Sequence, residues 1–161
     1  MLISLAHNHA TFIKNSKLKS CVPWEDATFP FIAAELNQEL LTFFALCYKA
    51  RAIQIGFETI SEELACEKKG LDTLSQSEAL KVSRLLFVTA DASERLKHNS
   101  ESLVKTHGLR MMGVLLSGSS ELLGARIHPK KRPIKVVMIK RKEFVVRAIE
   151  LLCGVSLNEP N

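Results

Sequence analysis

One aspartate stands where α/β proteins often hold ligands. Asp91 directly follows the apolar run Leu85–Ala90, and ligands collect at the carboxyl ends of strands in such sheets. One interpretation is a Mg²⁺-dependent phosphoacceptor aspartate. Such a site needs further carboxylates and usually a lysine nearby, and Gly56-Phe57 stands after the first predicted strand instead of an acidic pair. Helix capping by Asp91, with Glu94 three residues on, is the interpretation that this pattern favours.

The other reactive side chains form no recognisable chemical site. The chain has no nucleophile elbow, dinucleotide-binding loop or P-loop, and Gly118-Ser119-Ser120 fits a helix cap better than a phosphate site. The cysteines have no zinc-site spacing, so we expect reduced thiols, with Cys47 and Cys153 buried. We therefore expect no metal, no cofactor and no catalysis. The four cysteines are Cys21, Cys47, Cys66 and Cys153.

Positive charge is concentrated in the second half of the chain. The net charge is +5 and the pI is about 9.1. Residues 1–90 carry a net charge of −1 and residues 91–161 a net charge of +6, with eight basic and no acidic residues in Arg126–Lys142. This asymmetry indicates a polyanionic partner, nucleic acid first. The alternative is a solvated face that only improves solubility.

Hydrophobic periodicity predicts alternating helices and strands from residue 35 onward. Apolar residues recur at helical spacing in five segments, and four short apolar runs separate them. This order predicts a three-layer α/β/α sandwich of about 120 residues. The expected helices are 35–50, 57–69, 91–107, 118–127 and one ending at Leu152, and the expected strands are 53–55, 84–90, 111–116 and 134–139.

Three loops of this arrangement are expected at one edge of the sheet. Two of them begin helices, whose free N–H groups and dipoles favour phosphate oxygens. The third contributes a cluster of cations between two prolines. Together they favour RNA or DNA over a small anion, and the alternative is helix caps plus a solubilising turn. The loops are Gly56–Thr59, Asp91–Arg95 and His128–Pro133.

Several short motifs, in order, resemble one family. They are Lys49-Ala50-Arg51, Ile55-Gly56-Phe57-Glu58, Leu85–Ala90 with Asp91-Ala92-Ser93-Glu94, and Glu121-Leu122-Leu123-Gly124-Ala125. Over residues 36–152 the chain resembles the kink-turn-binding ribosomal proteins of the L-seven-Ae and L-thirty-e type, and within them the bacterial YlxQ-like branch. The resemblance implies a four-stranded mixed sheet between helices. It also implies a non-catalytic, cytoplasmic RNA-binding protein associated with ribosomes or RNA processing.

The resemblance also implies which residues contact RNA. Most of them lie at the start of the second helix, after the second strand and before the last strand, and two more lie at the end of the first helix. The chain departs from the kink-turn signature at Glu58 and Glu62, where Asn and Lys are expected, and these carboxylates would repel phosphate. The implied contact residues are Lys49, Arg51, Gly56, Phe57, Glu58, Thr59, Asp91, Ala92, Ser93, Arg95, Ile127, His128, Lys130, Lys131 and Arg132.

The first 35 residues differ from the rest in having two prolines, the single Trp and no clear period. Ala10-Thr11-Phe12 and Val22-Pro23 resemble the tail and linker of a YlxR-like nucleic-acid-binding domain. We therefore expect an extension at 1–35, an RNA-binding domain at 36–154 and a flexible tail at 155–161. The longest apolar run is about nine residues, which predicts no membrane partner.

Three alternative functions stay open at this point. The first is a protein-interaction module, on the ribosome or elsewhere, that keeps the fold with weak RNA affinity. The second is the RNA-recognition half of an RNA-modifying enzyme. The third is the phosphoacceptor enzyme centred on Asp91.

Overall fold

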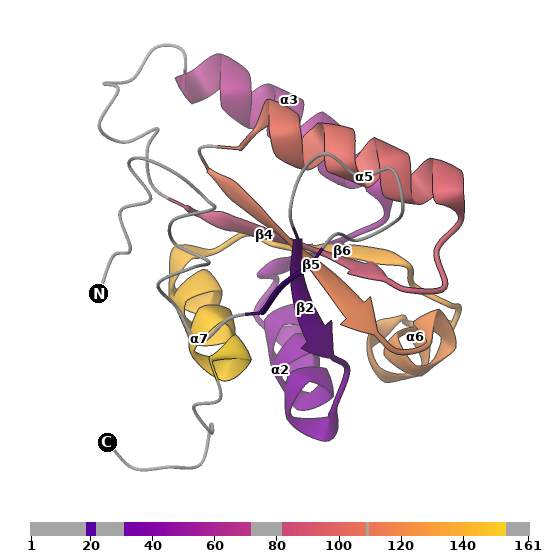
Figure 1. The fold of residues 1–161 in the computed structure, drawn as a ribbon. Coiled ribbons are helices and arrows are strands. Elements are labelled where there is room, and N and C mark those ends of the chain that lie inside the picture. The colour runs from indigo at the N-terminus through magenta and orange to yellow at the C-terminus, as the bar shows by residue number, and fades with distance from the viewer. Residues whose placement is uncertain (1–18, 22–30, 72–81, 109, 154–161) are drawn as a thin grey trace.

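The computed structural model describes residues 19–21, 31–71, 82–108 and 110–153 (Figure 1). Three predictions are not addressed by these residues. The side chain of Cys21 is outside the described part of the structure, as are residues 10–12 and 22–23, which resemble a YlxR-like domain, and the tail at 155–161. The strands are β1 (Lys19–Cys21), β2 (Phe31–Glu35), β3 (Ile53–Ile55), β4 (Arg84–Thr89), β5 (Met111–Ser117) and β6 (Val136–Ile139). The helices are α2 (Gln38–Lys49), α3 (Phe57–Leu71), α5 (Glu94–Thr106), α6 (Ser120–Ile127) and α7 (Lys142–Leu152).

The strands form one mixed sheet in the order β1-β2-β5-β4-β6-β3. Strands β2, β5 and β4 are parallel, whereas β6 is antiparallel to both β4 and β3, and β1 is antiparallel to β2. The predicted α/β class and mixed sheet are confirmed. The predicted number of four strands is wrong, because β1 and β2 add to the sheet from the segment before residue 36.

Helices cover both faces of the sheet. Helices α2, α6 and α7 lie on one face and α3 and α5 on the other, which gives the three predicted layers (Figure 1). Phe44 of α2 meets Phe87 of β4 edge-on with ring centroids 5.0 Å apart, and on the opposite face Ile60 of α3 packs in the second core cluster. Strands β4 and β6 are buried almost throughout, as expected for strands covered on both sides.

Several helices and strands begin or end at other residues than predicted, and hydrogen bonds explain two of these differences. Helix α2 begins at Gln38, three residues later than expected, because the Asn37 side chain caps it by accepting from Leu40 N at 2.9 Å. Strand β6 begins at Val136 rather than residue 134, because Ile134 N donates to Ser120 O of α6 at 2.9 Å. Helix α3 continues through Gly70 to Leu71.

Two cysteines follow the burial predictions only in part. Cys47 is fully buried on α2, and this burial raises the pKa of its thiol to about 12. Cys153 is half-buried rather than buried, and Cys66 is exposed. Cys47 and Cys66 carry free thiols. Of the helices that the structure describes, none combines the length and apolar character needed to cross a bilayer.

Candidate nucleic-acid interface

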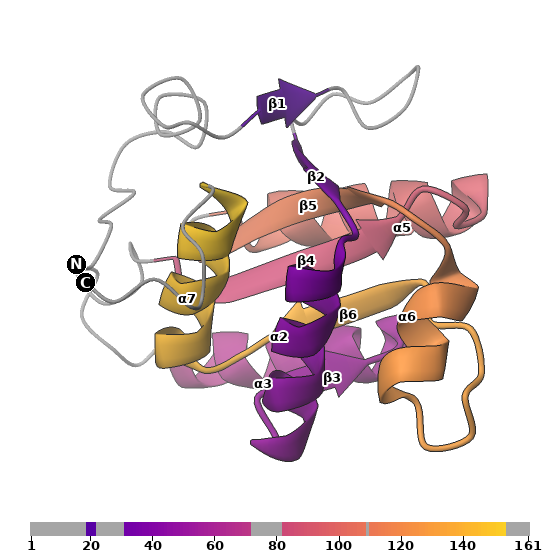
Figure 2. The same cartoon turned by 90° about the horizontal axis from the view of Figure 1, so that it is seen from below.

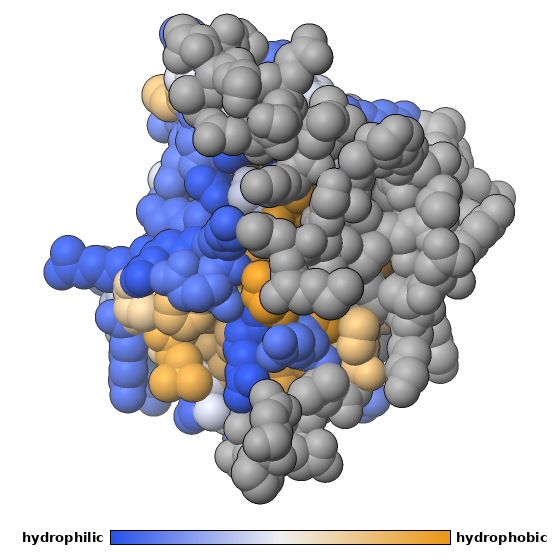
Figure 3. All heavy atoms as spheres, turned by 90° about the vertical axis from the view of Figure 1, so that its left-hand side faces the viewer, coloured by the Kyte–Doolittle hydropathy of each residue, from blue (hydrophilic) through white to orange (hydrophobic). Residues whose placement is uncertain are grey.

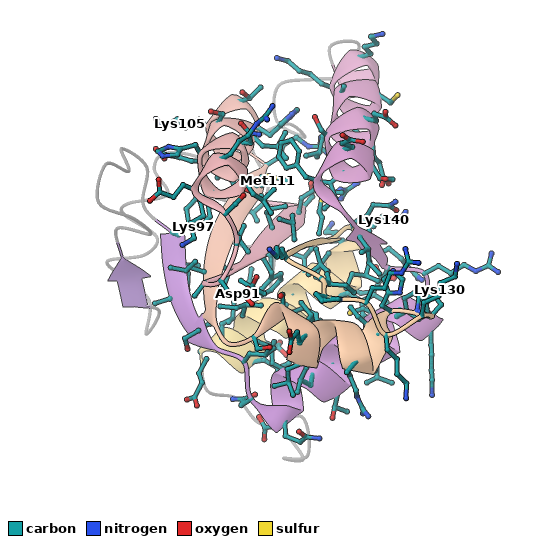
Figure 4. The ribbon with its side chains drawn as sticks, turned by 90° about the vertical axis from the view of Figure 1, so that its right-hand side faces the viewer. Asp91, Lys97, Lys105, Met111, Lys130 and Lys140 are labelled. Atoms are coloured by element: carbon teal, nitrogen blue, oxygen red, sulfur yellow. The ribbon has the colours of Figure 1, made fainter. Side chains whose placement is uncertain are left out.

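The three predicted loops meet at the start of β6. Gly56 N donates to Val136 O at 3.2 Å, and Thr89 N donates to Lys135 O at 2.9 Å. The ends of β3 and β4 are thereby hydrogen-bonded to the place where the basic loop enters β6. Figure 4 looks onto this edge of the sheet, with Asp91 near its centre and Lys130 to one side. We call it the loop edge.

The start of α3 depends on a glycine. Gly56 has a φ of +92°, a conformation that side chains other than glycine's rarely adopt. Its carbonyl then accepts from Ile60 N at 3.1 Å, in the first turn of α3. Glu58 and Thr59 are exposed on that turn, whereas Phe57 packs against the core beneath α3 and α5.

Some of the implied contact residues serve packing instead. Ala92 and Ile127 are buried in the two core clusters, so their side chains are not available to a ligand. Ser93 is the N-cap of α5 and accepts from Leu96 N at 3.2 Å. Arg95 is exposed on the first turn of that helix.

The predicted capping of α5 by Asp91 is wrong. The carboxylate of Asp91 accepts from Ser120 N at 3.0 Å and from Ser120 Oγ at 2.8 Å, so it stabilises the start of α6. The turn after β4 places Asp91 two residues before the actual cap, Ser93, and beside the chain that leaves the neighbouring parallel strand β5. Ser119, as predicted, caps α6 by accepting from Glu121 N and Leu122 N.

These contacts shift the pKa of Asp91. Burial alone would raise it, but hydrogen bonds from Thr89 and Ser120 and the positive charge of Lys135 outweigh burial and hold the pKa below its ordinary value. The ionised carboxylate is thus the form that the folded protein favours. In the part of the chain that the structure describes, no group of three or more His, Cys, Asp or Glu side chains is arranged to hold a metal ion.

The basic loop is fixed by its own backbone. His128 Nδ1 accepts from Lys130 N at 3.0 Å, and His128 O accepts from Lys131 N at 2.9 Å. The carbonyl of Arg132 lies so close to Gly124 on α6 that a Cβ atom there would be 1.9 Å from it. The loop therefore presents its side chains from a defined position.

The charges around this loop are available for a ligand. Arg126, Lys130, Lys131, Arg132 and Lys135 are all exposed, and none of them forms an ion pair with another described residue. Lys135 was not among the implied contacts, although it belongs to the basic stretch that the sequence shows. Its position beside Asp91 follows only from the pairing of β6 with β4.

Two implied contact residues lie elsewhere. Lys49 ends α2 and Arg51 follows it, at the start of β3, whereas the loop edge lies at the end of that strand. The antiparallel pairing of β3 with β6 places them beside the end of β6. The structure therefore does not bring Lys49 and Arg51 together with the three loops.

Replacing Asp91 with Ala is expected to lower the free energy of unfolding by about 1 kcal/mol at pH 7, because α6 loses a charged cap. The folded-state pKa is below the unfolded one, so this stabilisation is present above the ordinary aspartate pKa of about 3.9 and is lost as the pH falls further. Urea unfolding of both proteins at pH 7 and near pH 3 measures it. Equal stabilities at pH 7 would show that the bridge to Ser120 contributes nothing.

Replacing Gly124 with Ala is expected to displace the basic loop. Overpacking costs about 1–3 kcal/mol, and better helix propensity offsets up to about 1 kcal/mol of it. Urea unfolding measures the net loss. The matched control is Gly70→Ala in α3, where a Cβ has open space and stability should be unchanged or higher. If both variants are equally stable, the close approach of Arg132 to α6 does not fix the loop.

Comparisons with known proteins bear on the fold alone. No family model matches the chain, and no curated protein matches it. Among solved structures, it is similar to a protein from Bacillus halodurans that is described as having unknown function. The two share 20% sequence identity with a TM-score of 0.51, over 70% of this chain and 94% of the other.

Proposed function

We propose that this protein binds structured RNA at the loop edge without catalysing a reaction, and that it acts in the cytoplasm in association with ribosomes or RNA processing. The observation that carries the proposal is the meeting of two helix starts with the exposed cations of the basic loop, which form no ion pair with another described residue. Backbone N–H groups at helix starts and cationic side chains are the usual phosphate contacts of nucleic-acid-binding proteins.

An extended polyanion fits the loop edge better than a small anion does. The cations are spread along the chain from Arg126 to Lys135 and are exposed, so they do not converge on one enclosed point. The resemblance to kink-turn-binding proteins supports RNA over DNA. The carboxylate of Asp91 is already engaged by Ser120, which supports a structural role for it.

The experiment is a titration of the protein with a kink-turn RNA, a plain RNA duplex and a DNA duplex at several salt concentrations. We expect salt-dependent binding to RNA with a log–log slope near −3.5, on the basis of about four phosphate contacts at ~0.9 each. The kink-turn should bind little better than the duplex because of Glu58 and Glu62. Absence of salt-dependent binding to all three nucleic acids would overturn the proposal.

A protein-interaction module is the second candidate. Leu122 on α6 is 49% exposed beside the loop edge, and Glu58 and Glu62 are exposed on α3. An exposed apolar side chain and exposed carboxylates suit a protein partner better than phosphates. This candidate would replace the first one if the three titrations fail.

A further inference from the structure

A second group of basic side chains lies at the opposite end of β6. Arg141 Nη1 donates to Ala50 O at 3.2 Å, and Lys140 N donates to Ala52 O at 3.0 Å. These bonds join the end of α2 to the start of α7, although the two segments are far apart in the sequence. We call this group the far cluster, and it consists of Lys49, Arg51, Arg141 and Lys142.

Two cations occupy backbone conformations that favour glycine. Arg51 has a φ of +56° and Lys131 a φ of +53°, and no other non-glycine residue in the described ranges has a positive φ. Left-handed conformations are normally filled by Gly or Asn, because a Cβ crowds the backbone there. One of these residues belongs to the basic loop and the other to the far cluster.

The start of α7 also departs from a local preference. Its N-cap is Arg141, which makes no side-chain capping bond, and Lys142 is the first helical residue. Positive charge is disfavoured at a helix N-terminus, where the dipole favours anions. Local stability therefore does not explain the cations at Arg51, Lys131 and Lys142. Residues that are unfavourable for their local backbone are expected where the side chain binds a ligand.

The positive charges of the far cluster are largely exposed to solvent. Lys49, Arg51 and Lys142 are exposed, and the described residues offer none of them an ion-pair partner. Arg141 is held by Glu143 and by the Phe144 ring, 5.3 Å away, while its side chain stays 50% exposed. Figure 3, which faces the side of the molecule where α7 lies, shows a wide hydrophilic area beside a smaller apolar one.

We propose that the far cluster is a second phosphate-contact site, so that the RNA ligand includes a duplex segment lying along the β3 side of the sheet from the basic loop to the start of α7. This inference rests on the proposed function. Figure 2 shows the loop after α6 and the end of α2 on the same side of the molecule, next to β3. Lys135 and Arg141 are six positions apart along β6 and its flanks, or about 20 Å, which corresponds to roughly six base pairs at ~3.4 Å each.

The test compares two RNA probes and two variants. The long probe is a duplex of about 16 base pairs and the short probe a hairpin of about four, which is too short to contact both groups. The first variant is Arg51→Gly with Lys142→Ala, and the matched control is Lys68→Ala with Lys69→Ala, exposed in the last turn of α3. Both variants remove two positive charges.

On the long probe the far cluster adds about two phosphate contacts to the four expected at the loop edge. We therefore expect the first variant to bind the long probe at least about tenfold more weakly, with a salt slope reduced by about 1.8. Its affinity for the short probe should change by less than about twofold, as should the affinity of the control for either probe. Its melting temperature should be unchanged or higher, because both substitutions relieve a local conflict.

Two results would overturn the inference. If both probes bind but the first variant behaves like the control, the far cluster does not contact RNA and the proposed function is unaffected. If the wild-type protein binds neither probe, the proposed function fails and the inference fails with it. An acidic protein partner would then be the remaining use of these cations.

Discussion

Replacing Lys130, Lys131 and Arg132 with Ala is expected to weaken RNA binding by about a hundredfold at low salt, or about 2.7 kcal/mol. The log–log salt slope should flatten by about 2.7, which is ~0.9 for each lost phosphate contact. The structure makes this the largest expected loss, because the three side chains are exposed on a loop that is anchored to α6 at Gly124. Titrations at several salt concentrations measure both quantities.

The Lys68→Ala, Lys69→Ala variant controls for net charge. It removes two cations that lie far from the loop edge. For each charge removed, it should lower the RNA affinity much less than the triple variant does, because salt at 0.1 M screens exposed charges beyond about 10 Å. Melting temperature must be compared as well, since Lys131→Ala leaves a Cβ in a left-handed conformation. If the triple variant keeps both the affinity and the slope of the wild type, the basic loop is only a solubilising turn.

Replacing Glu58 with Asn and Glu62 with Lys is expected to improve kink-turn binding tenfold to a hundredfold, a gain of about 1.4–2.7 kcal/mol. Both side chains are exposed, one turn apart on α3, and Glu58 lies beside the loop edge. A carboxylate about 4 Å from a phosphate costs about 1 kcal/mol even in water, and a charge-assisted contact is lost in addition. Fluorescence titration with a kink-turn RNA measures the change.

A straight RNA duplex is the control for this double variant, because altered net charge improves binding to any RNA. A gain confined to the bent RNA would show that α3 recognises the bend. An equal gain on both RNAs would place the helix near RNA without such recognition. A gain on neither, or nanomolar kink-turn binding by the wild type, would contradict the role given to Glu58 and Glu62.

Local patterns in the sequence were sufficient for most of the fold. The strands predicted at 53–55, 84–90, 111–116 and 134–139 and all five described helices are present with small shifts at their ends, because periodicity and apolar runs are properties of neighbouring residues. Strand β2 was not predicted. Its five residues follow a proline and show no alternation, and it becomes a strand through pairing with β5, about 80 residues away.

The site was predictable to a similar extent. The meeting of three loops at one edge follows from the alternation of strands and helices. The bridge from Asp91 to Ser120 does not, since local spacing points to the helix that begins three residues later. The role of Gly124 was also hidden, because only the packed structure shows Arg132 against it.

The most direct test of the proposed interface is a titration of the isotope-labelled protein with an RNA duplex, followed through its backbone amide NMR signals. We expect the largest shifts at Gly56–Thr59, at Ser93–Arg95 and along His128–Lys135, with smaller shifts around Arg51 and Lys142. Amides at the end of α3, near Lys68, should stay unchanged. Saturable shifts centred on another surface, or no shifts at millimolar RNA, would contradict RNA binding at the loop edge.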